Sequence, residues 1–256
     1  MEKISIIGVD ANNLSQYPDV VCFINPKHPS FPHKTEWLKQ RFSEGLQIKL
    51  LFVEGQKKAA GLIEYVPGQF AWRAVSAEGY LFIHCIFLYP NNNKGKGYGS
   101  LLVESCLEDA RESNALGLAV ITSKGSFMAE SRLFLKNGFE LLEEDGAGNQ
   151  LLVRPLKEGP LPHLNDWKAR QADFQGLHIL YSRQCPWVAR LIDEIREEGL
   201  EDKLKMQIKE LTVPSEAQQA PSSYAVFNLL HNGRLLADRY VSVTRLKNIL
   251  EKEKLL

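Results

Sequence analysis

Glycine and lysine alternate in the segment Lys94–Ser100, which reads KGKGYGS. Glycines at 95, 97 and 99 allow a tight backbone turn that approaches a phosphate without a Cβ clash. If a helix begins directly after the turn, its first N–H groups and its dipole also favour an anion. The pattern predicts a pyrophosphate-binding loop made by Lys94, Gly95, Lys96, Gly97, Tyr98, Gly99 and Ser100.

The segments around this loop have the patterns of a strand and a helix. Tyr80–Tyr89 (YLFIHCIFLY) is almost wholly apolar, which is typical of a central strand covered on both faces. Ser100–Ala115 has apolar residues at helical spacing, and Leu116–Thr122 is expected to be the next strand. A dinucleotide-binding fold is disfavoured, because the spacing is not G-x-G-x-x-G and no acidic residue ends a matching second strand.

This stretch resembles the GNAT superfamily of N-acetyltransferases, whose Q/R-x-x-G-x-G/A motif follows a strand and a proline-containing turn. The chain has KGKGYG at that place, with Lys94 at the position of the usual Gln or Arg, and Leu133–Phe139 (LFLKNGF) is similar to the family's LYxKxGF segment. The resemblance covers about residues 3–155. It implies that acetyl-CoA lies between the strands Ile83–Tyr89 and Leu116–Thr122. Main-chain groups of Ile86, Phe87 and Leu88 would then pair with its pantetheine arm.

Candidates for the proton transfers are few. Acetyl transfer from a thioester needs an unprotonated amine, a donor for the carbonyl oxygen and often an acid for the leaving thiolate. Many GNAT relatives have a Tyr for the last role, but this chain has Phe134 among the residues expected beside the cofactor, so another group or solvent must act. His84 and Glu78 are the candidate bases. His84 also fits a hydrogen-bonded core residue, and Glu78 a solvated strand end.

The other elements of the first part predict an α/β fold with a mixed sheet over residues 1–156, and the resemblance implies that this is the GNAT acyltransferase fold. We expect a strand at Lys3–Val9, a helix at His33–Glu44, a hairpin of Ile48–Val53 and Ala59–Tyr65, a helix at Glu130–Asn137, and a hairpin of Phe139–Glu143 and Gln150–Arg154. The resemblance implies that the acceptor pocket lies around Phe23–Trp37 and Val66–Ala77, which are rich in aromatic residues.

The composition changes after Pro155. Residues 157–176 are expected to be a linker, and residues 177–256 a small second domain. Its predicted elements are the strand Leu177–Ser182, the helix Pro186–Glu198, the strands Lys205–Leu211, Tyr224–His231 and Leu235–Val241, and the helix Thr244–Lys254. A β-α-β unit followed by β-β-α is the thioredoxin arrangement, with Pro221 as the counterpart of its cis-proline. The whole chain is similar to YoaP-type acetyltransferases, whose C-terminal domain is thioredoxin-like.

Cys185 is the candidate reactive group of this second domain. It follows a strand and opens a helix, where the helix N-terminus favours a thiolate. Val188 stands where a resolving cysteine would be, which excludes a dithiol cycle within the domain. Cys185 therefore fits thiol binding, substrate recognition or metalloid capture, and it equally fits a half-buried packing or dimerisation residue.

The overall composition disfavours several classes of binding partner. Thirty-one Lys and Arg balance 31 Asp and Glu, so no net charge recruits nucleic acid or an anionic membrane. The four cysteines form no C-x-x-C pair, which argues against a disulfide framework and a zinc ribbon. Neither a membrane span nor a signal peptide is expected, and the predicted location is cytoplasmic.

Three functions remain open. The first is a metal-independent N-acetyltransferase that acts on a small-molecule or amino-acid-like amine. The second is a thiol-handling protein that uses Cys185, with the GNAT domain only binding acyl-CoA. The third is a non-enzymatic acyl-CoA-binding module. The sequence is also compatible with a homodimer.

Overall fold

The computed structural model describes residues 3–125 and 128–256, and the chain forms two compact units. The first comprises Met1–His28, Leu38–Ala71 and Ser76–His163, and the second Pro29–Trp37, Trp72–Val75 and Leu164–Leu256. Two short segments, 29–37 and 72–75, therefore belong with the carboxyl-terminal part of the chain. No helix within the described ranges has the length and apolar character needed to cross a membrane.

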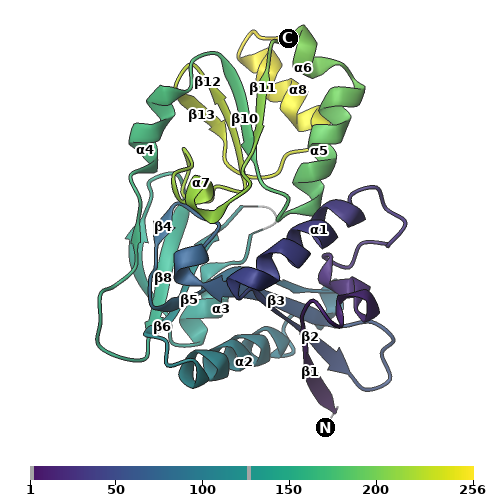
Figure 1. Cartoon of the computed structure of the whole chain (residues 1–256), viewed down its shortest axis with the longest axis vertical. Coiled ribbons are helices and arrows are strands. Elements are labelled where there is room, and N and C mark those ends of the chain that lie inside the picture. Colours follow the sequence, from purple (N-terminus) through teal and green to yellow (C-terminus); the bar gives the residue numbers. More distant parts are fainter. Residues whose placement is uncertain (1–2, 126–127) are drawn as a thin grey trace. The chain divides into compact units, whose positions relative to one another are not determined.

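A seven-stranded sheet in the order β1-β2-β3-β5-β6-β8-β7 forms the first unit (Figure 1). Its strands are β1 (Ile4–Val9), β2 (Gln47–Val53), β3 (Gly61–Pro67), β5 (Tyr80–Leu88), β6 (Gly117–Ser123), β7 (Glu140–Glu144) and β8 (Asn149–Pro155). Neighbouring strands are antiparallel except β5 and β6, which are parallel. The mixed sheet and its predicted strands are confirmed, with ends that differ by at most two residues.

Helix α2 (Tyr98–Glu112) covers the middle of this sheet (Figure 1). Its residues Leu102, Cys106 and Leu107 are fully buried in a core shared with β3, β5 and β6. The short helix α3 (Ser131–Lys136) adds Phe134 to the same core. Helix α2 begins two residues before the predicted start, directly after the left-handed Gly97. The predicted helix His33–Glu44 is α1 (Phe31–Arg41) followed by a 3-10 turn, Phe42–Glu44.

The second unit has a four-stranded sheet in the order β11-β10-β12-β13. Its strands are β10 (Leu177–Tyr181), β11 (Gln207–Glu210), β12 (Phe227–His231) and β13 (Arg234–Ala237). Strand β10 is parallel to β11 and antiparallel to β12, which is antiparallel to β13. Helices α5 (Pro186–Glu197) and α8 (Val243–Lys252) pack their apolar sides into its core. Two shorter helices are α6 (Leu200–Lys203) and α7 (Pro214–Gln218).

Four predictions for this part of the chain need correction. The strand predicted at Leu235–Val241 is β13, which ends at Ala237. Strand β12 starts at Phe227 and not at Tyr224, because Ala225 has a φ of +62° that interrupts extended backbone. The segment 157–176 is not a plain linker: it contains β9 (His163–Leu164), α4 (Trp167–Arg170) and a 3-10 turn, Gln171–Asp173. The cis-proline expected at Pro221 is wrong, since the cis peptide bond found in the described part of the chain is Tyr89–Pro90.

Candidate active site

The two parallel strands of the first sheet separate part-way along their length. Strands β5 and β6 pair from Tyr80 with Gly117 to Ile83 with Val120. Strand β5 then continues to Leu88 and β6 to Ser123, and no further pairing between them occurs within the described residues. One backbone edge of residues 84–88 is therefore open toward β6. This is the opening that the resemblance implied.

His84 lies where the strands separate. On the other edge of β5, Tyr65 pairs with Ile83 but Glu64 pairs with Cys85, so His84 is the extra residue of a β-bulge. A bulge redirects the side chain that it carries. The Nδ1 atom of His84 lies 3.4 Å from Oε1 of Glu64, and both side chains are almost completely buried. A carboxylate stabilises the imidazolium that forms when a neighbouring imidazole takes up a proton. The pair therefore has the composition of a general base and its orienting partner.

The predicted phosphate loop follows β5 directly. Gly95 and Gly97 have φ values of +83° and +87°, and a Cβ placed on either would meet no atom within 4 Å. Glycine is thus needed for the backbone conformation, and the space beside both residues is open. The Leu101 N–H donates to the Gly97 carbonyl and closes the first turn of α2. The N–H groups of Gly99 and Ser100 precede that bond and point out of the helix end.

The other residues predicted to bind the cofactor have different exposures. Lys94 and Lys96 are exposed, and the Lys96 ammonium lies 5.7 Å from the ring centroid of the buried Tyr98. Ile86 and Leu88 are partly buried against the core of α2, whereas the side chain of Phe87 is exposed. Their predicted contacts are main-chain contacts, so these exposures do not decide the prediction.

Phe134 and Glu78 lie apart from the pair formed by His84 and Glu64. The ring of Phe134 is fully buried and packs edge to face on Phe139, with ring centroids 5.2 Å apart. Glu78 is exposed in the turn before β5, at the end of the strand opposite to the glycine loop. His84 thus lies much nearer to the opening than Glu78 along β5, and catalytic roles for these residues stay predictions.

Two residues of this region are absent from those that the sequence predicts. Glu64 is a single charge in the apolar run GLIEYVP of β3, a signal that could have identified it. Thr122 is completely buried on β6, and its hydroxyl has no hydrogen-bond partner among the described residues. Its type and position in a β-rich run give no such signal, because threonine is common in strands.

A polar network holds α2 on the sheet below the glycine loop. The Lys49 ammonium donates to the Asp109 carboxylate at 2.6 Å and to the Ser105 hydroxyl at 2.8 Å. The Tyr65 hydroxyl on β3 also donates to Asp109, and burial raises the pKa of this phenol well above its ordinary range. These contacts fix the helix whose N-terminus faces the loop.

Cys185 lies in the second unit at the N-cap of α5 and is half-buried. Desolvation raises the pKa of its thiol above the ordinary value, although N–H groups of α5 and the charges of Lys34 and Arg73 oppose that shift. Arg73 is buried, donates to Gln184 Oε1 at 2.7 Å and stacks on the Tyr224 ring at 4.3 Å. Because the thiol stays protonated at neutral pH, its surroundings favour a packing or recognition role over nucleophilic attack.

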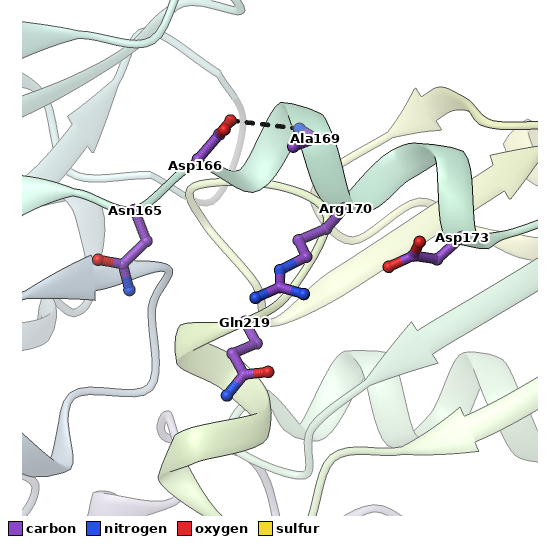
Figure 2. Close-up of a pocket in the computed structure, with 6 residues that line it drawn as sticks. All are labelled: Asn165, Asp166, Ala169, Arg170, Asp173 and Gln219. Atoms are coloured by element: carbon purple, nitrogen blue, oxygen red, sulfur yellow. Dashed lines mark hydrogen bonds between the residues drawn. The ribbon is translucent and has the colours of Figure 1, made fainter.

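A separate hollow of about 340 Å³ also lies in the second unit (Figure 2). It is lined by Asn165, Asp166, Ala169, Arg170, Asp173 and Gln219. Figure 2 shows the Asp166 carboxylate accepting the Ala169 N–H, while the Arg170 side chain extends toward Gln219. Its charged side chains are exposed, and none of them is a residue predicted for function. Within residues 3–125 and 128–256, no His, Cys, Asp and Glu residues cluster as a metal site would require.

Residues 18–139 match the model of the family described as "Acetyltransferase (GNAT) family". The matched span contains β5, β6, the glycine loop and α2, which together form the opening. Residues 18–139 are therefore similar to the acyltransferases of the GNAT family.

One relative extends the similarity beyond that domain. The chain is 26% identical over 222 residues to "Uncharacterized N-acetyltransferase YoaP" of Bacillus subtilis (strain 168). The matched region covers 85% of this chain and 86% of the relative. Similar solved structures include a GNAT-family acetyltransferase of Staphylococcus aureus Mu50, at 15% identity and a TM-score of 0.45 over 60% of this chain and 100% of that one. Another is the PaiA N-acetyltransferase of Thermoplasma acidophilum in complex with coenzyme A, at 13% identity and a TM-score of 0.43 over 60% and 99%.

Proposed function

We propose that the protein transfers the acetyl group of acetyl-CoA to the amine of a small acceptor molecule. The observation that carries this proposal is the separation of β5 from β6 beyond Ile83 and Val120. The glycine loop and the N-terminus of α2 follow the open edge of β5 directly in the chain, and the His84–Glu64 pair lies where the opening begins.

The residues at the opening suit acetyl-CoA in chemistry and shape. The open edge of residues 84–88 offers main-chain groups that can pair with the amides of a pantetheine arm. Open space beside Gly95 and Gly97 leaves room for a pyrophosphate, and the Gly99 and Ser100 N–H groups can donate to it. The exposed ammonium groups of Lys94 and Lys96 add charge attraction.

Acetyl-CoA supplies an acetyl group that is activated as a thioester. In the transfer, the amine nitrogen forms a bond to the acetyl carbon, and the carbon–sulfur bond breaks with its electron pair going to sulfur. The amine must also lose a proton. His84 accepts that proton, and Glu64 orients the ring and stabilises its charged form. The products are an N-acetylated amine and free CoA.

The aromatic residues near the end of β5 support an acceptor with an apolar group beside its amine, as many amino-acid-like molecules have. Phe23 stacks on Tyr89 with ring centroids 5.2 Å apart and lies 5.7 Å from Phe87. Phe87 and Tyr89 are 38% and 42% exposed, which is unusual for large aromatic side chains and favours a binding surface. Phe23 also begins one of the two segments that the sequence predicts for the acceptor.

We further infer that the second unit is thioredoxin-like. Its sheet order β11-β10-β12-β13, with one parallel and two antiparallel pairs, agrees with the β-α-β and β-β-α arrangement of that fold. The raised pKa of Cys185 favours a role in recognition or packing over thiol exchange. The unit would then support the transferase and not supply its nucleophile.

The test is release of free CoA thiol from acetyl-CoA in the presence of a panel of amines. We expect turnover with at least one amino-acid-like amine, and a loss of about 10²–10⁴ in kcat/KM for His84→Gln. Replacement of the exposed His163 by Gln is the matched control and should leave the rate unchanged. Acetyl-CoA binding without turnover of any amine would instead support the binding-module hypothesis.

A further inference from the structure

The hydroxyl of Thr122 is buried in the first unit without a partner among the described residues. The residue is completely buried, and no group in the described part of the chain forms a hydrogen bond with its Oγ1. Buried hydroxyls nearly always have a partner, because an unpaired one loses its bonds to water without replacement. Where such an atom lies beside an opening between strands, a bound ligand can supply the missing partner.

Thr122 lies in the separated part of β6. It is two residues beyond Val120, the last residue of β6 that pairs with β5, and its backbone is held on the other side by Gln150 of β8. Side chains alternate along a strand, and Leu118 and Val120 belong to the same core as Phe134. The Thr122 side chain therefore points to the side of the sheet on which Phe134 lies.

Phe134 stands where many GNAT relatives have a tyrosine, so this side of the sheet has no phenol there to donate to the leaving sulfur. Its ring is fully buried against Phe139 and carries no polar atom. When the carbon–sulfur bond of a thioester breaks, negative charge develops on sulfur, and a donor held in a water-poor site stabilises it strongly. Thr122 supplies a fixed hydroxyl on the same side, within the separated strands.

We propose that the Thr122 hydroxyl donates a hydrogen bond to the sulfur of bound CoA, which makes Thr122 a catalytic residue of the transfer. This inference rests on the proposed function. The electron pair of the broken carbon–sulfur bond goes to sulfur, and the Thr122 proton stays on its own oxygen throughout. The hydroxyl thus stabilises the leaving thiolate, which then takes its proton from His84 or from water.

Tyr80 provides a matched control within the same sheet. Its hydroxyl is also buried without a hydrogen-bond partner among residues 3–125 and 128–256. However, Tyr80 pairs with Gly117 at the start of β5, in the closed part of the strand pair. Tyr80→Phe therefore removes an equivalent unpartnered hydroxyl away from the opening.

The experiment measures the binding of CoA and of desulfo-CoA by calorimetry to the wild type, Thr122→Val, Thr122→Ser and Tyr80→Phe. At a pH where the CoA thiol is ionised, loss of a hydrogen bond to the sulfur should weaken CoA binding to Thr122→Val about tenfold. Desulfo-CoA should bind equally to all four proteins, and Thr122→Ser and Tyr80→Phe should bind CoA as the wild type does. Ligand-free Thr122→Val should melt no lower than the wild type, since it loses only an unpaired hydroxyl.

Two results would overturn the inference. Either Thr122→Val binds CoA as tightly as the wild type, or it loses affinity for CoA and desulfo-CoA equally, which would place the contact elsewhere on the ligand. The proposed function fails separately, if the wild type binds neither CoA nor acetyl-CoA.

Discussion

Replacement of Gly97 by Ala isolates the contribution of one backbone conformation to acyl-CoA binding. Gly97 has a φ of +87°, and an added Cβ would meet no atom within 4 Å. The substitution therefore causes no clash, and its whole effect is the cost of a left-handed conformation for a residue with a side chain, about 1–2 kcal/mol. If bound acyl-CoA requires this conformation, the free loop relaxes but the bound loop cannot. The Kd for acetyl-CoA should then rise about 5- to 30-fold.

Gly55 is the matched control for this substitution. It has a φ of +83°, and its Cβ would likewise meet no atom within 4 Å, but it lies in the turn between β2 and β3. Gly55→Ala should lower the free energy of unfolding by a similar amount, about 1–2 kcal/mol, and leave acetyl-CoA affinity unchanged. Calorimetric titration of both variants decides the matter. The reasoning is refuted if Gly97→Ala binds as tightly as the wild type, or if Gly55→Ala loses as much affinity.

Three further predictions concern single side chains. Glu64→Gln should lower kcat/KM at least tenfold with little change in acetyl-CoA affinity, because the imidazolium of His84 loses its carboxylate; unchanged pH–rate profiles would contradict that role. Cys185→Ser should retain acetyl transfer, and loss of turnover would restore the thiol-handling hypothesis. Iodoacetamide should modify Cys185 slowly at pH 7 and faster only above pH 9, because burial raises the pKa of its thiol. Desolvation and the Glu210 carboxylate raise the pKa of Tyr181 from 10.0 to about 12. The phenol therefore contributes fully to the free energy of unfolding below about pH 10, and this contribution is lost as the pH rises toward 12. Urea titrations should show the wild type losing about 2–3 kcal/mol more than Tyr181→Phe over that interval, and parallel losses would argue against the shift.

The strands of the first unit could be predicted because each has an apolar run and a turn signal at its ends. The tight turn predicted for the glycine loop is also present, since Gly95 and Gly97 occupy left-handed positions that few other residues adopt, while its binding of phosphate stays a prediction. The β-bulge at His84 could not be predicted, because it depends on the register between β3 and β5, and no local pattern encodes that register. Without the bulge, the sequence places His84 on the central strand but does not bring Glu64 to it.

The part of the chain after Pro155 shows where local patterns fail. Segment 157–176 contains Pro160, Pro162 and several polar residues, which predict a loop, yet Asp166 caps a short helix that buries Trp167. The sequence predicts too long a strand at β12, because nothing in the sequence marks the left-handed conformation of Ala225. Segments 29–37 and 72–75 belong to the second unit through tertiary contacts, which local sequence patterns cannot predict because these segments are distant in sequence from the rest of that unit.

The most direct test of the central claim is the shift in melting temperature caused by acetyl-CoA, measured on the wild type and on Gly97→Glu. At a concentration about 100 times Kd, binding to the native state stabilises it by about 2.7 kcal/mol, which raises the melting temperature of a chain of this size by about 5–10 °C. Gly97→Glu should lose the shift, because it places a bulky anion at a left-handed position of the loop. A wild-type protein that shows no shift with saturating acetyl-CoA would contradict the account.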